Sequence, residues 1–168
     1  MKFNNDMLRL YAVTDRHWTG EQTLYEQVRD VLMGGATCLQ LREKDLDEAS
    51  FYEEAKNIKE LCRLFDVPFI INDNVMLAKE IDADGVHVGQ DDMACVKARE
   101  ILGPDKIIGV SAHTIEEARI AKEHGADYLG IGAIFPTSSK DDAEVLGIKR
   151  LKEMTDTVDL PMVAIGGI

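Results

Sequence analysis

The sequence predicts a single α/β domain built as a parallel barrel of the TIM (β/α)8 type. Short apolar runs rich in β-branched residues alternate with segments of helical spacing, as in βαβ units. Polar residues follow nearly every apolar run at its C-terminal end, which is typical of a site at one mouth of a barrel. A doubly wound open sheet would gather such residues only near its switch point and is therefore less favoured.

Seven runs are expected to be strands that are buried on both faces, because they are short and apolar. They lie at residues 10–14, 38–41, 69–71, 85–88, 107–110, 128–134 and 162–165. Six segments with apolar residues at helical spacing lie between them, at residues 24–32, 51–62, 75–81, 96–102, 115–121 and 148–154. A helix end, a small residue and a strand entry recur around Ala36, Ala83 and Ala126, which supports a repeating unit.

The seventh expected strand reaches the last residue, Ile168. A complete barrel has eight strands, so residues 1–168 are expected to form one domain that lacks a helix, the eighth strand and a last helix. Both edges of a seven-stranded sheet would stay unpaired. On this interpretation the chain is truncated after the seventh strand, and the isolated polypeptide is expected to be weakly active or inactive.

Composition and charge limit the partners. With 19 basic and 31 acidic side chains the net charge is −12, which disfavours nucleic acid and anionic membranes as ligands. No apolar run approaches the roughly 20 residues of a membrane span, and the N-terminus does not resemble a signal peptide. Cys38, Cys62 and Cys95 form no CxxC pair and fit reduced thiols. A cytoplasmic protein acting on small molecules is expected, and assembly as a homo-oligomer stays open.

An anion site is expected around one strand end. Gln40, Arg42 and Lys44 alternate along and just past the strand at 38–41, so their side chains can point the same way. Arginine offers a fork for phosphate oxygens and lysine a mobile point charge. The alternative is that Arg42 forms a structural salt bridge with Glu43 or Asp73. Further residues that favour the anion site are Asn72, Ser111 and Lys140.

Two aspartates predict a magnesium site. Asp73 and Asp92 follow consecutive strands, where loops at one mouth can bring carboxylates together. Magnesium takes one or two carboxylates and completes its shell with water and substrate phosphate oxygens. The alternative is that each aspartate caps a helix, starting near Val75 and Val96 respectively.

Other polar residues carry less specific signals. The loop after the sixth strand holds hydroxyls and Lys140, which suits phosphate but also an ordinary solvated loop. The pair Gly166-Gly167 lets backbone amides approach a ligand where barrels often bind phosphate. His87 is interpreted as a hydrogen-bonded core residue, whereas His113 is a weaker candidate at the mouth.

Taken together, six motifs resemble the thiamine-phosphate synthase family, in order along the whole chain. These motifs are Tyr11-Ala12-Val13-Thr14-Asp15, Gln40-Leu41-Arg42-Glu43-Lys44, Ile71-Asn72-Asp73, Gly85-Val86-His87-Val88-Gly89-Gln90-Asp91-Asp92, Gly109-Val110-Ser111-Ala112-His113 and Gly130-Ile131-Gly132-Ala133-Ile134-Phe135-Pro136-Thr137.

The resemblance implies a TIM-barrel transferase. It would condense 4-amino-2-methyl-5-(diphosphooxymethyl)pyrimidine with 4-methyl-5-(2-phosphooxyethyl)thiazole to give thiamine phosphate and diphosphate, with Mg2+ and a dissociative carbocation mechanism. The implied catalytic residues are Arg42, Lys44, Ser111 and Lys140, and the implied magnesium ligands are Asp73 and Asp92. The implied substrate contacts are Gln40, Leu41, Arg42, Glu43, Lys44, Asn72, Ser111, Thr137, Ser138, Ser139, Lys140 and Gly167.

Three other functions stay open. A thiazole tautomerase would share the fold but would not need Lys44, Asp73 or Asp92. An aldolase on the same barrel would form a Schiff base through Lys44 or Lys140. A shortened, inactive chain would serve only as a ligand-binding module.

Overall fold

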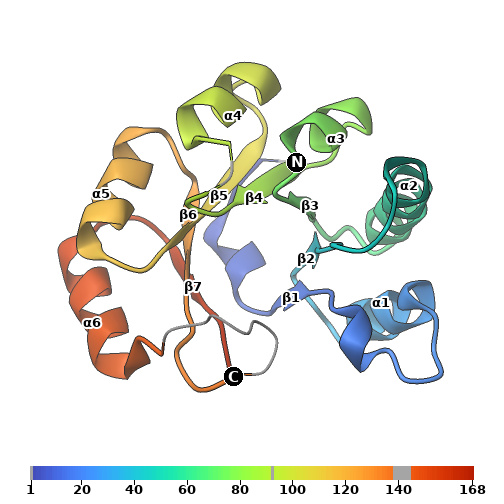
Figure 1. The fold of residues 1–168 in the computed structure, drawn as a ribbon, viewed down its shortest axis with the longest axis horizontal. Coiled ribbons are helices and arrows are strands. Elements are labelled where there is room, and N and C mark those ends of the chain that lie inside the picture. Colours follow the sequence, from blue (N-terminus) through green and yellow to red (C-terminus); the bar gives the residue numbers. More distant parts are fainter. Residues whose placement is uncertain (1, 92, 138–144) are drawn as a thin grey trace.

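The computed structural model describes residues 2–91, 93–137 and 145–168. Seven parallel strands follow one another in chain order and curl into a nearly closed, TIM-like barrel, with the helices outside them (Figure 1). The predicted fold class is thereby confirmed. The strands are β1 (Tyr11–Val13), β2 (Cys38–Leu41), β3 (Phe69–Asn72), β4 (Gly85–Val88), β5 (Ile107–Ala112), β6 (Tyr128–Ile131) and β7 (Met162–Ala164).

Within the described residues, six α-helices and two 3-10 helices connect or precede the strands. The α-helices are α1 (Leu24–Met33), α2 (Glu48–Leu64), α3 (Val75–Glu80), α4 (Cys95–Leu102), α5 (Ile115–Glu123) and α6 (Gly147–Thr157), and the 3-10 helices are η1 (Asn5–Leu8) and η2 (Arg16–Trp18). In the described ranges β1 pairs only with β2 and β7 only with β6. None of these described helices combines the length and apolarity that a bilayer crossing requires.

Most expected strand ends lie within two residues of the observed ones. The exception is the run at 128–134, because β6 already ends at Ile131. The amides of Ile134 and Phe135 still donate to carbonyls that follow β7, at 2.9 Å each, but outside the regular ladder. The chain after β6 therefore stays next to the chain after β7 without continuing the strand.

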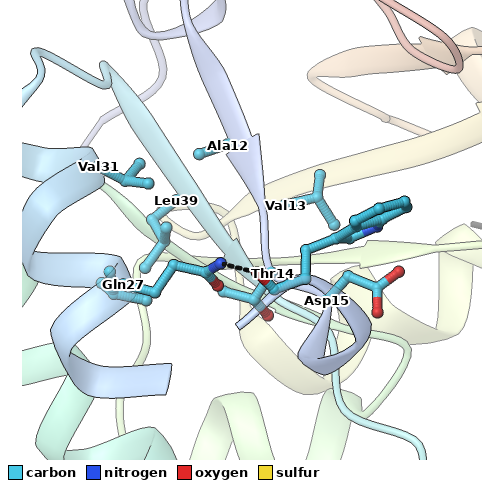
Figure 2. A pocket seen from close by; sticks show the side chains of 9 residues that line it. Ala12, Val13, Thr14, Asp15, Gln27, Val31 and Leu39 are labelled. Atoms are coloured by element: carbon cyan, nitrogen blue, oxygen red, sulfur yellow. Dashed lines mark hydrogen bonds between the residues drawn. The ribbon is translucent and has the colours of Figure 1, made fainter. Parts of the chain in front are cut away.

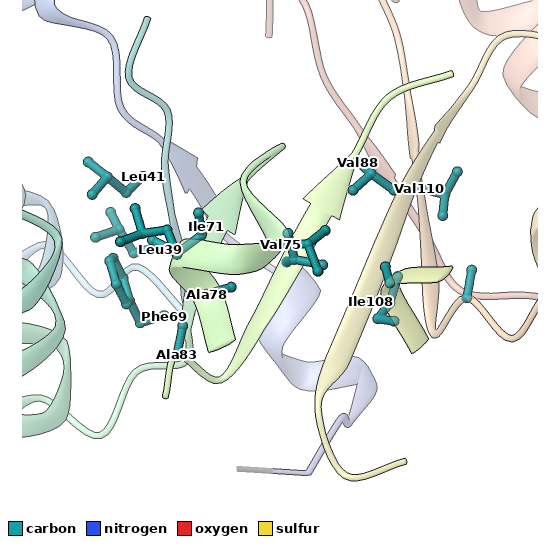
Figure 3. Packing of buried hydrophobic residues seen from close by; sticks show 14 of the residues in the cluster. Leu39, Leu41, Phe69, Ile71, Val75, Ala78, Ala83, Val88, Ile108 and Val110 are labelled. Atoms are coloured by element: carbon teal, nitrogen blue, oxygen red, sulfur yellow. The ribbon is translucent and has the colours of Figure 1, made fainter. Parts of the chain in front are cut away.

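Strand alternation produces two separate cores. Residues that point outward pack beneath the helices and form the larger core (Figure 3). Residues that point inward form a smaller core inside the barrel, closed at the N-terminal end of the strands by Met7 of η1. The inner core comprises Met7, Cys38, Ile70, Ile107 and Tyr128, with Phe3, Leu8, Tyr11 and Val163 packed against it. The mouth at the opposite end remains for polar groups.

Candidate active site

A chain of hydrogen bonds crosses the barrel interior below the mouth. The Gln40 Nε2 group donates to the Tyr11 hydroxyl at 2.9 Å, and the hydroxyls of Tyr11 and Tyr128 lie 2.6 Å apart. Nδ1 of His87 lies 3.0 Å from the Tyr128 hydroxyl, and its Nε2 lies 2.9 Å from Oγ of Ser111. This interior relay (Gln40, Tyr11, Tyr128, His87, Ser111) joins two predicted substrate residues, and it confirms His87 as a hydrogen-bonded core residue.

Two glycines make room for the relay. Gly109 lies in register between His87 on β4 and Tyr128 on β6. A Cβ atom at Gly109 would lie 2.1 Å from Cζ of Tyr128 and 2.5 Å from Nδ1 of His87. A Cβ atom at Gly130 would lie 2.8 Å from Cε1 of His87. The imidazole and phenol rings thus fill the volume that side chains at these two positions would occupy.

Both tyrosines keep their phenolic protons at neutral pH. Burial raises the pKa of Tyr11 well above its ordinary value, and the neighbouring Cys38 acts in the same direction. Burial likewise raises the pKa of Tyr128 well above its ordinary value. The relay therefore contains two neutral hydroxyl groups, each able to donate one hydrogen bond and to accept others.

Lys44, Asp73 and Asn72 meet at the mouth of the barrel. Nζ of Lys44 lies 2.5 Å from Oδ2 of Asp73, and Nδ2 of Asn72 donates to Oδ1 of the same carboxylate at 2.9 Å. The Lys44 side chain is 51% exposed and that of Asp73 is 24% exposed, so solvent reaches the pair. The Asp73 carboxylate, just after β3, therefore forms an ion pair with Lys44 from the loop after β2.

The backbone holds Asp73 in an uncommon conformation. Its φ of 62° is left-handed, and its amide donates to the carbonyl of His87 at 2.8 Å. The N-cap of α3 is Asn74, whose side chain accepts from the amide of Leu77. The capping interpretation of Asp73 was therefore wrong, and its carboxylate contacts Lys44 and Asn72 instead.

Arg42 makes neither of the two salt bridges considered for it. Its backbone amide donates to Oγ1 of Thr14 at 2.9 Å, and Oγ1 of Thr14 donates to the carbonyl of Arg42 at 3.2 Å. Asp73 instead binds Lys44, and Glu43 binds Arg16 at 2.5 Å. In the described ranges the guanidinium of Arg42 forms no ion pair, so its fork can meet a ligand.

The side chain of Glu43 stabilises the loop after β2 through hydrogen bonds to the backbone of that loop. Its side chain is only 2% exposed and accepts from the backbone amides of Lys44 and Asp45 at 2.9 and 3.1 Å. Burial opposes its charge, but these amides and the Arg16 guanidinium prevail and lower the pKa of Glu43. The Leu41 side chain is fully buried in the outer core. A ligand contact at Leu41 would therefore be made through the backbone.

Replacing Glu43 with glutamine is expected to lower the free energy of unfolding by about 1–3 kcal/mol at pH 7, because hydrogen bonds to a buried charge are lost. The folded-state pKa of Glu43 is depressed, so this stabilisation is present above its unfolded pKa and is lost as the pH falls through the folded value. Urea unfolding of both proteins at pH 7 and pH 3 measures this difference. An equal gap at the two pH values would contradict the assignment.

Two further mouth contacts involve the ends of β4 and β5. Nε2 of Gln90, just after β4, donates to the carbonyl of Ser111 at 2.6 Å. His113 turns toward α5, where its Nδ1 lies 3.4 Å from Oε2 of Glu117. The structure therefore joins Ser111 to the loop after β4 and places His113 beside an α5 carboxylate.

The loops after β6 and β7 lie against each other. A Cβ atom at Gly167, whose φ is 70°, would lie 2.7 Å from the carbonyl oxygen of Pro136. Thr137, a predicted phosphate contact, directly follows Pro136 in this loop. The predicted site residues Asp92, Ser138, Ser139 and Lys140 lie outside the described residues.

Asp73 suits magnesium by its chemistry. Its carboxylate already attracts one cation, the Lys44 ammonium, at a partly exposed position. Magnesium binds one or two carboxylates and takes its other ligands from water and substrate phosphates. Within the described ranges no group of three His, Cys, Asp or Glu side chains is arranged to hold a metal. Such a closed set is not what a substrate-bridging magnesium ion requires.

Two other features involve none of the predicted site residues. A small pocket between β1, β2 and α1 is lined by none of the predicted site residues; there Nε2 of Gln27 donates to the carbonyl of Trp18 at 3.2 Å (Figure 2).

The three cysteines are free and buried, as predicted for reduced thiols. Burial raises the pKa of Cys62 to about 12, and those of Cys38 and Cys95 also rise, so none is an activated nucleophile.

Comparison with known proteins points in the same direction as this geometry. Thiamine-phosphate synthase from Clostridium acetobutylicum is 50% identical over 160 residues, which cover 95% of this chain and 76% of that protein. The enzyme of the same name from Clostridium tetani is 50% identical over 159 residues, with the same coverage. The chain thus spans about three quarters of the length of these relatives.

Solved structures agree. Thiamine phosphate pyrophosphorylase from Pyrococcus furiosus superposes with a TM-score of 0.87 at 42% identity, over 98% of this chain and 77% of that chain. An N-acetylmannosamine-6-phosphate 2-epimerase from Clostridium perfringens, with a TM-score of 0.66 at 15% identity, shares the fold alone. The family described as thiamine monophosphate synthase matches residues 10–168. The chain therefore belongs to the thiamine monophosphate synthase family.

Proposed function

We propose that this chain catalyses the synthesis of thiamine phosphate from an aminopyrimidine methyl diphosphate and a thiazole phosphate, releasing diphosphate. The names of the relatives support this reaction, and so does the polarity of the mouth. The observation that carries it is the contact of Lys44 and Asn72 with one carboxylate, Asp73, while Arg42, two residues before Lys44, forms no ion pair in the described part of the chain. Two cations and a carboxylate that could bind a metal ion match a magnesium diphosphate.

The reaction needs one bond to break and one to form. The bond between the methylene carbon and the diphosphate oxygen breaks, and its electron pair leaves with the diphosphate. The methylene carbon then carries a positive charge that the aminopyrimidine ring delocalises. The thiazole nitrogen donates its electron pair to this carbon and closes the new bond. No enzyme nucleophile takes part.

The chain supplies groups that stabilise the departing charge. Arg42 and Lys44 lie at the end of β2 and Ser111 near the end of β5, so they can approach a diphosphate from two sides of the mouth. Preorganised donors aimed at charge that develops in the transition state are usually the largest catalytic contribution. Lys140 is proposed to add a further positive charge.

Asp73 and Asp92 are proposed to hold magnesium. The bound ion would neutralise charge on the diphosphate and make it a better leaving group. Asp73 would have to exchange its contact with Lys44 for the ion, which would release the Lys44 ammonium toward the diphosphate. In this proposal Lys44 and Asp73 contact each other in the absence of substrate, and they separate when the diphosphate binds with magnesium.

The remaining contacts are proposed from the family pattern. Gln40 and Asn72 would bind the pyrimidine diphosphate together with the chain at Leu41 and Glu43, although Glu43 directs its own side chain to Arg16. The thiazole phosphate would lie where the loops after β6 and β7 meet. Its proposed contacts there are Thr137, Ser138, Ser139 and Gly167.

The cellular setting is proposed from composition. A net charge of −12 suits a cytoplasmic enzyme that binds small phosphorylated molecules with magnesium rather than nucleic acid or membranes. A Schiff-base aldolase through Lys44 is not favoured, because Nζ of Lys44 already forms an ion pair with Asp73. A tautomerase would not need Lys44 or Asp73, so their contact at the mouth does not favour that function.

Single-turnover synthesis tests the proposal. The chain is mixed in molar excess with the pyrimidine diphosphate, the thiazole phosphate and magnesium, so that even slow turnover yields measurable product. Thiamine phosphate and diphosphate are expected in equal amounts, and only when both substrates are present. Tight binding of both substrates without product would instead favour the ligand-binding module.

A further inference from the structure

We propose that His87 is a positioning residue, held in its Nε2–H tautomer by the interior relay, and that this tautomer directs the hydroxyl proton of Ser111 toward the ligand. The inference rests on the proposed function for the identity of the ligand, a diphosphate. Which nitrogen of the His87 ring carries the proton is a property of the ligand-free chain and does not depend on that function. His87 touches no reacting atom in this account, and it acts through Ser111.

The direction of the relay starts at Gln40. Its amide nitrogen is a donor only, so the bond of 2.9 Å makes the Tyr11 oxygen an acceptor. Tyr11 then has one proton to donate, and the oxygen of Tyr128 at 2.6 Å is a stronger acceptor than the thiol of Cys38 in the same inner core. Tyr128 therefore accepts from Tyr11 and keeps its own proton for the next link.

That next link determines the state of the imidazole. Tyr128 donates to Nδ1 of His87 at 3.0 Å, which requires a lone pair on Nδ1. A neutral imidazole with a lone pair on Nδ1 carries its proton on Nε2. The Nε2–H group then donates to Oγ of Ser111 at 2.9 Å. Each of the five side chains donates or accepts without conflict.

The ligand end of the relay requires the same direction. Diphosphate oxygens accept hydrogen bonds, so Ser111 can bind them only with its own proton. If Nε2 of His87 were the acceptor, it would compete with the ligand for that proton. With the Nε2–H tautomer, Ser111 accepts from His87 and remains a donor to the mouth.

The other end of the relay becomes an acceptor. In the described ranges every fully buried side-chain polar atom has a hydrogen-bond partner. Oε1 of Gln40 accepts no hydrogen bond from these residues, so this oxygen is not fully buried and retains contact with solvent. Gln40 is 5% exposed, which leaves little more than this oxygen to meet a ligand. An acceptor at Gln40 and a donor at Ser111 match a molecule that carries an amino group and a diphosphate.

Packing prevents the relay from reorganising freely. The imidazole of His87 fills the space beside Gly109 and Gly130, and the rings of His87 and Tyr128 have centroids 5.5 Å apart. Tyr128 in turn stacks on Phe3, with an interplanar angle of 3° and centroids 6.1 Å apart. The ring orientations are therefore determined by shape as well as by hydrogen bonds.

Nitrogen NMR of the ligand-free chain at neutral pH tests the ring state. Two-bond 1H–15N correlations distinguish a protonated from an unprotonated ring nitrogen, and the His87 signals are those that disappear in His87→Gln. We expect Nε2 protonated and Nδ1 unprotonated. The opposite tautomer, or a ring protonated on both nitrogens, would overturn the proposal.

Tyr128→Phe and Tyr11→Phe test the relay, with Tyr25→Phe as the control because Tyr25 is exposed on α1. Tyr128→Phe is expected to abolish the single tautomer and Tyr11→Phe to weaken it, whereas the control leaves it unchanged. Thermal unfolding verifies that each variant is folded. An unchanged tautomer in a folded Tyr128→Phe protein would overturn the relay.

Binding of inorganic diphosphate with magnesium tests the consequence at Ser111. Tyr128→Phe is expected to weaken binding about tenfold, in the range of one hydrogen bond to a charged group, and Ser111→Ala by a similar factor. Parent affinity in Tyr128→Phe would overturn the coupling. Failure of the parent chain to bind diphosphate would contradict the proposed function instead, while the NMR result would still decide the ring state.

Discussion

Gly109→Ala is expected to lower the free energy of unfolding by about 3 kcal/mol or more, the largest stability change that we predict for one methyl group. The added Cβ would lie 2.1 Å from Cζ of Tyr128 and 2.5 Å from Nδ1 of His87. Both rings are buried and share a hydrogen bond, so neither can move far without breaking the relay. Urea unfolding followed by circular dichroism measures the change.

Gly34→Ala is the matched control for this substitution. Gly34 ends α1 with an ordinary φ of −73°, and a Cβ there would come no closer than 3.3 Å to another atom. Its stability is expected to stay within about 1 kcal/mol of the parent. A similarly small change for Gly109→Ala would show that the barrel interior can repack around the new methyl group, contrary to this account.

Asp73→Asn is expected to reduce the rate of thiamine phosphate synthesis roughly 100-fold, the largest change in rate to which we assign a magnitude. Asparagine tolerates the left-handed conformation of this position, so the backbone at a φ of 62° should be kept. The negative charge that attracts Lys44 and would hold magnesium is lost. The free energy of unfolding should change by less than about 1 kcal/mol, because the ion pair is partly exposed.

Asp66→Asn is the control for Asp73→Asn. Asp66 also has a left-handed backbone, with a φ of 55°, but it lies in the turn before β3 rather than after it. The control should retain the parent rate and the parent dependence on magnesium. If Asp73→Asn retained both as well, Asp73 would have no part in metal binding.

The strands, and the gathering of polar side chains at their C-terminal ends, were predictable because both depend on local patterns. Short apolar runs such as 38–41 and 85–88 match β2 and β4 in both bounds. Polar residues after a parallel strand must lie at one mouth, whatever the helices do. The meeting of Lys44 with Asp73 required only that β2 and β3 be neighbours, as the pairing of Leu41 with Ile71 shows.

Side-chain partners inside the barrel were not predictable in this way. Tyr11 and Tyr128 are 117 positions apart, and their hydroxyls meet only because the barrel curves. Neither residue carried a signal beyond an apolar strand, although the glycines at 109 and 130 could have indicated a bulky neighbour. The ion pair between Glu43 and Arg16, in a 3-10 helix, was not predictable for the same reason: it joins segments that are distant in the sequence. Arg42 therefore does not have Glu43 as its partner.

Diphosphate release with both substrates present, measured with and without magnesium in the parent chain and in Asp92→Ala, tests the central claim most directly. The claim is that the barrel mouth binds a magnesium diphosphate and expels it from the pyrimidine substrate. We expect release only in the presence of magnesium, and a large loss in an Asp92→Ala protein that folds normally. Release at the parent rate without magnesium, or in Asp92→Ala, would contradict it.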